Sequence, residues 1–155
     1  MILGQGEALA VLSGAAALFF AEPSEARAQP VRDGRRRAEE LRAGAKTDLS
    51  GRSREDWLAV SRWIGEAADH AFRAVEDALI LGASDPALGP LAAGVAQSAA
   101  SLGRALDQWG RPETCQRELA QAKRLADGTL HDWRRARSRG AAEPRVVASM
   151  KTGAV

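Results

Sequence analysis

The residues best suited to chemistry are two histidines and their acidic neighbours. Glu66 and His70 are four positions apart, so on a helix both side chains lie on one face. A zinc site needs three or four converging ligands, and the further donors are His131 and Asp132, far along the chain. Glu66, His70 and His131 are therefore weak metal candidates, and a surface Glu and His pair on a charged helix is the favoured interpretation. We predict no metal and no cofactor.

The single cysteine, Cys115, offers a second kind of chemistry. It lies near a predicted helix start, where the helix dipole favours a thiolate nucleophile. However, Cys115 is in line with Leu119 and Ala122 on an apolar stripe, which favours a small buried side chain. The chain has no phosphate-binding loop, no H-E-x-x-H and no C-x-x-C-H motif. We therefore predict that the protein is not an enzyme and has no small-molecule substrate.

A basic cluster lies near the end of the last predicted helix and contains Arg134, Arg135, Arg137 and Arg139. The helix dipole stabilises cations there, which is a sufficient structural explanation. The functional alternative is contact with anions on a protein, a membrane surface or a nucleic acid. With Trp63, these arginines are the partner-binding residues that we predict. A protein partner is favoured, and nucleic acid or an anionic membrane surface is the alternative.

The first 28 residues are typical of an export signal. An uncharged run from Ala8 to Ala21 is followed by a polar segment and then by Ala26-Arg27-Ala28, an A-x-A cleavage pattern before Gln29. We expect residues 1–28 to be a signal peptide and the protein to be periplasmic or secreted. The segment before the run contains no Lys or Arg. A retained apolar helix or membrane anchor is therefore the alternative, in which these side chains pack on the rest of the protein: Leu9, Leu12, Ala16, Phe19 and Phe20.

The remaining chain has the length of one domain, and its apolar periodicity predicts helices only. Residues 29–52 are rich in charge and poor in apolar periodicity, so we predict a flexible linker. Ser53 has the spacing of a helix N-cap, and three amphipathic helices follow: 53–81 before Gly82, 91–109, and from 112 to near 139. Residues 140–155 are a predicted disordered tail.

Short connections between these helices predict an all-α fold, a small antiparallel three-helix bundle (up-down-up) over residues 53–139. Trp57, Trp109 and Trp133 lie on the apolar stripes and are expected to be core or lid residues. The net charge of the whole chain is only +2, which gives little electrostatic attraction to nucleic acid.

Without a catalytic motif, the sequence favours a non-enzymatic, exported helical accessory or interaction protein that docks on a larger envelope complex. The alternative is a cytoplasmic helical adaptor that binds nucleic acid through the basic cluster from Arg134 to Arg139.

Overall fold

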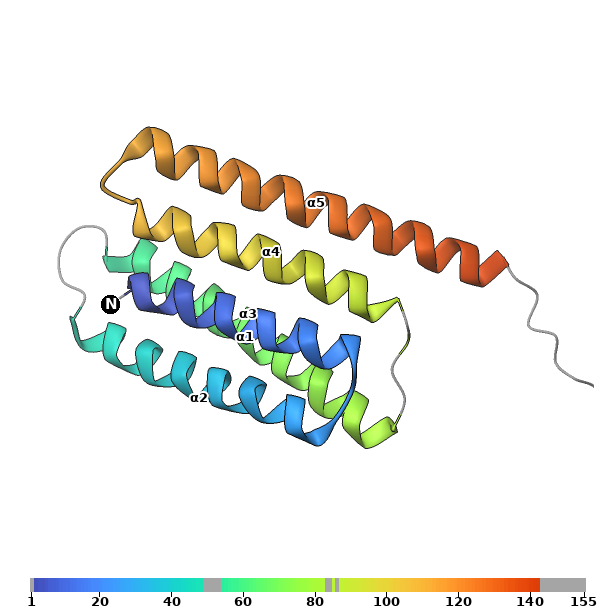
Figure 1. Cartoon of the computed structure of the whole chain (residues 1–155). Helices are drawn as coiled ribbons and strands as arrows, with labels where there is room; N and C mark the ends of the chain where they lie inside the picture. The colour runs from blue at the N-terminus through green and yellow to red at the C-terminus, as the bar shows by residue number, and fades with distance from the viewer. Residues whose placement is uncertain (1, 49–53, 83–84, 86, 143–155) are drawn as a thin grey trace, which may run out of the picture.

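The computed structural model describes residues 2–48, 54–82, 85 and 87–142, with side chains for 4–44, 54–82, 85 and 87–138. Over these residues the chain forms five α-helices and no strand, which confirms the all-α prediction. Successive helices alternate in direction (Figure 1). Their bounds are α1 Ile2–Ala21, α2 Glu25–Asp48, α3 Arg54–Leu81, α4 Leu88–Asp107 and α5 Pro112–Ala142.

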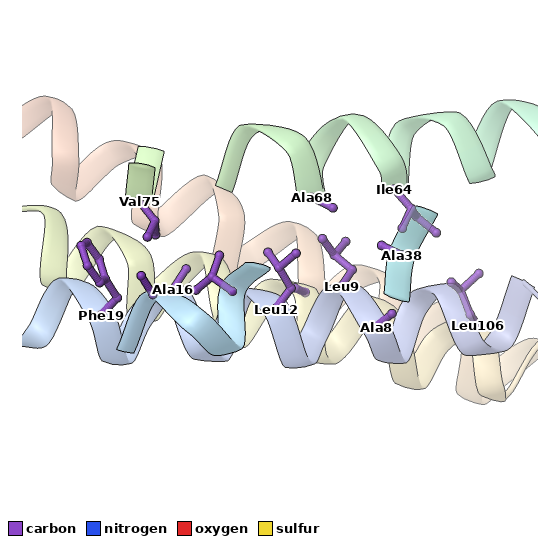
Figure 2. Close-up of a cluster of buried hydrophobic side chains, with 13 residues drawn as sticks. Ala8, Leu9, Leu12, Ala16, Phe19, Ala38, Ile64, Ala68, Val75 and Leu106 are labelled. Carbon is purple, nitrogen blue, oxygen red and sulfur yellow. The ribbon is translucent and has the colours of Figure 1, made fainter. Parts of the chain in front are cut away.

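Helix α1 is the centre of the molecule, because it packs against α2, α3 and α4. Leu12 and Phe19 of α1 are 0% exposed. Figure 2 shows the buried side chains of α1 in a row along the helix, with Ile64, Ala68 and Val75 of α3 close by. The apolar N-terminal segment therefore supplies much of the core.

Residues 2–21 form one apolar helix in the structure. Helix α1 is also the one helix, among the described residues, that is long and apolar enough to cross a membrane by length and composition. Its window Gly4–Ala21 has a mean hydropathy of 1.3, and 44% of it is buried inside the protein. Core helices, signal sequences and membrane anchors share this length and apolarity.

The prediction of a flexible linker is wrong over residues 29–48, because these residues belong to the helix α2, and residues 49–52 lie outside the described part of the chain. Its buried stripe is narrow and built from small residues, with Ala28 and Val31 fully buried and Ala38 nearly so. Gly34 lets α2 approach α1 closely, since a Cβ there would lie 3.3 Å from the Leu12 Cα atom. The stripe escaped the sequence prediction because charged residues and Pro30 dominate this segment.

Helix α2 is joined to α3 by ion pairs. Arg32 Nε donates to Glu76 Oε1 and Arg35 Nε donates to Asp69 Oδ1, each at 2.8 Å. Arg32 also pairs with Glu25 on its own helix. Hydrogen bonds to Glu25 and Glu76 raise the pKa of Arg32, and that to Asp69 raises the pKa of Arg35. The charges that suggested a linker thus help to hold α2 on α3.

Helix α4 packs on the opposite side of the bundle from α2, and α5 packs on α4 alone among the described helices (Figure 1). Gly6 and Gly103 bring α1 and α4 close together: a Cβ on Gly103 would lie 3.2 Å from the Gly6 carbonyl oxygen. Across the next interface, Ser98 Oγ donates to the Ala122 carbonyl at 2.9 Å. The core therefore differs from the predicted three-helix bundle, because α3 and α4 each pack closely on α1 and their backbones do not approach each other closely.

Several predicted boundaries can be compared with the structure. Helix α3 ends at Leu81, and Gly82 follows with φ of +61°, the left-handed conformation that favours glycine at a helix end. Helix α5 continues through residue 142, so the tail predicted from residue 140 begins within a helix. The predicted N-cap Ser53 and residues 143–155 lie outside the described residues.

Candidate functional site

The structure does not bring the weak metal candidates together. Glu66 and His70 are exposed on α3, and Glu66 lies 3.9 Å from the Nε atom of Arg62. His131 is exposed on α5, which has no packing contact with α3 in the described part of the chain. Over the same residues, no three His, Cys, Asp or Glu side chains converge. Cys115 is buried, as expected for a small side chain on an apolar stripe.

The predicted partner-binding residues lie on two separate helices. Arg134, Arg135 and Arg137 are exposed in the last turns of α5, and the Arg137 guanidinium lies 5.3 Å from the ring centre of Trp133. Arg139 belongs to α5, but its side chain lies outside the described residues. Trp63 is exposed on α3. Because α3 and α5 do not pack together, these residues form two surfaces and not one.

An apolar groove lies between α3 and α4, with α1 below it. Both helices pack against α1, yet within the described residues their backbones do not approach each other closely. The space left between them measures about 380 Å³. It is lined by Ser13, Ala16 and Phe20 of α1, by Ala71, Ala74, Asp77, Ala78 and Leu81 of α3, and by Leu88, Leu91, Ala92 and Val95 of α4.

The lining combines small residues with exposed large ones. Alanines from all three helices line the groove. Because their side chains are small, a ligand can come close to the helix backbones. At its edges, Leu81 is 75% and Val95 is 46% exposed. Asp77 is the one charged residue among those that line it, and it is exposed. The groove is therefore an apolar surface with a single negative charge.

A pair of tryptophans closes the space between α3 and α4 at the other end of the bundle. Trp57 in the first turn of α3 and Trp109 just after α4 have ring centres 4.6 Å apart, in an edge-to-face arrangement. The groove is thus confined to the half that contains Ala71–Leu81 of α3. Ten residues of helix rise correspond to a length of about 15 Å.

The groove was not predicted from the sequence. Its residues come from three helices, and one of them, α1, was expected to be removed as a signal peptide. Alanines at helical spacing also look like ordinary core positions until their neighbours are known. The signal that the sequence did offer was Leu81, a large apolar residue placed directly before the helix-ending Gly82.

The comparisons with known proteins give no family. Neither a protein-family model, nor a curated protein, nor a solved structure matches this chain. The fold and the groove together define the class: an all-α bundle built on a central apolar helix, with an open apolar groove on one side.

Proposed function

We propose that this is a non-enzymatic helical interaction protein that binds an amphipathic helix of a larger protein partner in the groove between α3 and α4. One observation carries the proposal: α3 and α4 both pack on α1 and leave an apolar space between themselves. A fourth helix seated there would complete a four-helix bundle. Helix-in-groove binding is a common mode of protein recognition.

The lining indicates the chemistry of the partner helix. Ser13 and Ala16 lie at the bottom of the groove and alanines line its sides, so it can accept large aliphatic side chains. On a partner helix such side chains would be spaced three and four positions apart along one face. Asp77 at the edge favours a Lys or Arg beside that face. A groove about 15 Å long accommodates about three helical turns.

The proposal is tested by crosslinking at the groove in native cells. A photoreactive amino acid replaces Ala74, which is exposed in the groove, and in a matched variant it replaces Ala126, which is exposed on α5. We expect position 74, and not position 126, to crosslink to one partner, through a peptide with an apolar helical stripe and a basic residue. Ala74→Glu should abolish a complex isolated from the same cells, while Ala126→Glu should leave it intact.

Three results would contradict this function: crosslinking at 126 without 74, a complex that survives Ala74→Glu, or a crosslink from position 74 to a second copy of this chain. Circular dichroism melting of both glutamate variants checks that they fold. Both positions are exposed, so their melting temperatures should remain near that of the native protein.

We infer further that the working protein retains α1. The burial of Leu12 and Phe19 supports retention, because cleavage before Gln29 would remove them from the core and leave α2, α3 and α4 without their common neighbour. The test is the intact mass of the native protein from separated cell fractions. A mass that includes α1 is expected. A mass beginning at Gln29 in a periplasmic or secreted fraction would overturn retention and support the exported form.

A further inference from the structure

The series of ion pairs between α2 and α3 includes two arginines of α2 but does not continue to a third, Arg42. Arg32 pairs with Glu76 and Arg35 with Asp69, and Arg42, seven positions after Arg35, lies on the same face of α2. Opposite Arg42, however, α3 has a glycine and no acid: a Cβ on Gly65 would lie 2.9 Å from Arg42 Nη1.

Arg42 has no ion-pair partner among the described residues, although acids are close in sequence. Glu39 pairs with Arg35 at 2.9 Å, and Glu40 with Arg37 at 3.3 Å. Arg42 is half-buried and has no compensating charge among the described residues. Such a group gains from an added anion.

A pocket of about 650 Å³ lies beside Arg42, where α2 approaches the start of α3. Three arginines and one carboxylate line it, and they are Arg42, Arg54, Arg62 and Glu55. Leu58 and Ala59 add an apolar wall. Arg62 has only a long contact to Glu66 at 3.9 Å, with both side chains largely exposed, so that pair is weak.

The same pocket contains a buried hydroxyl in need of a partner. Ser61 lines it and is only 2% exposed, and its Oγ atom has no hydrogen-bond partner among the described residues. Buried polar groups without partners are rare and destabilise a fold. Arg42 and this hydroxyl therefore point independently to a missing anionic acceptor.

We propose that this pocket binds the phosphate group of a small phosphate monoester. A phosphate monoester carries a charge of about −1.5 to −2 at neutral pH, which the guanidinium groups of Arg42 and Arg62 can balance. The planar guanidinium groups of Arg42 and Arg62 can each donate two hydrogen bonds to its oxygens. Ser61 donates a further one, and Leu58 and Ala59 contact the organic part of the ligand. This site is separate from the groove, and either proposal can fail without the other.

The experiment is calorimetric titration of the full-length protein with phenyl phosphate at low ionic strength. Benzenesulfonate, a monoanion of similar shape, is the ligand control. The binding variants are Arg42→Gln, Arg62→Gln and Ser61→Ala, and the control variant is Arg135→Gln in the basic cluster of α5. Melting temperatures of all variants are recorded without ligand, so that loss of binding is separated from loss of folding.

We expect phenyl phosphate to bind at least about tenfold more tightly than benzenesulfonate, and each binding variant to raise its Kd about tenfold or more. Arg135→Gln should bind like the native protein. Ser61→Ala has a distinctive signature: it should weaken binding and yet raise the melting temperature of the free protein, because it removes a hydroxyl that lacks a partner in that state.

Four results would overturn the site. They are no measurable binding, equal binding of phenyl phosphate and benzenesulfonate, loss of binding in Arg135→Gln with retention in Arg42→Gln, and destabilisation of the free protein by Ser61→Ala. The third would place phosphate on the basic end of α5, and the fourth would show that Ser61 has a structural role only.

Discussion

At the scale of single residues, Leu18 and Phe19 are neighbours on α1 that differ in burial, so their substitutions can be compared directly. Phe19 is fully buried and Leu18 is 62% exposed. Phe19→Ala should lower the free energy of unfolding by about 3 to 5 kcal/mol, because it leaves a cavity at the centre of the bundle. Leu18→Ala should change it by less than about 0.5 kcal/mol. Urea unfolding measures both, and equal effects would contradict the central position of α1.

The pair between Glu25 and Arg32 predicts a pH dependence. A hydrogen bond from Arg32 lowers the pKa of Glu25 below its ordinary value of 4.5. A lowered pKa in the folded state gives stability that is present above the ordinary value and is lost as the pH falls through the lowered one. Melting temperatures of the native protein and Glu25→Gln should therefore differ at neutral pH and converge in acid. The effect is small because the Glu25 side chain is largely exposed.

A suitable control for that measurement is the same Glu25→Gln change made in an Arg32→Gln background, in which the guanidinium that pairs with Glu25 is absent. In that background, the melting temperatures with and without Glu25→Gln should differ by an amount that changes less across the same pH range. If the difference for Glu25→Gln in the native protein changed equally little, the contact with Arg32 would contribute nothing to folding.

At the scale of the helices, the interface between α4 and α5 depends on a glycine. A Cβ on Gly94 would lie 2.9 Å from the Thr129 Cβ atom, closer than packed carbon atoms come. Gly94→Ala should therefore destabilise the protein by about 1 to 3 kcal/mol, since the two helices must move apart. On α5, an added Cβ at Gly128 would meet nothing within 4 Å. Gly128→Ala should stabilise the protein by about 0.5 to 1 kcal/mol through helix propensity.

Thermal unfolding of the two alanine variants gives the comparison directly, because both make the same chemical change on facing helices. If Gly94→Ala were as stabilising as Gly128→Ala, α5 would not lie against α4 as closely as described, and the assignment of α5 to this face of the bundle would be wrong.

At the scale of the whole molecule, removal of residues 1–28 should abolish folding. The truncated chain loses Leu12, Phe19 and the other core residues of α1, while α3 and α4 lose the helix that holds them together. We expect no cooperative thermal transition and reduced helicity by circular dichroism. A cooperative transition in the truncated protein would show that the other four helices fold alone, as an exported mature form requires.

Local pattern was enough to predict three helices and one of their ends. The apolar stripes of α3, α4 and α5 have the spacing of a helix, and Gly82 adopts the left-handed conformation at the end of α3. Burial of Cys115 followed from its stripe as well. These features depend on residues a few positions apart, so they are determined within a short stretch of chain.

Tertiary contacts decided the role of the N-terminal third. An apolar segment such as α1 has the same composition whether it is cleaved, spans a membrane or fills a core. Only the tertiary structure shows that it packs against α2, α3 and α4. Helix α2 depends on arginines that find their acids on α3, and the groove and the pocket beside Arg42 each need residues from more than one helix. The sequence by itself determined which segments are amphipathic helices, because helical periodicity is local. The structure alone decided which faces meet and which remain open, because that depends on residues distant along the chain.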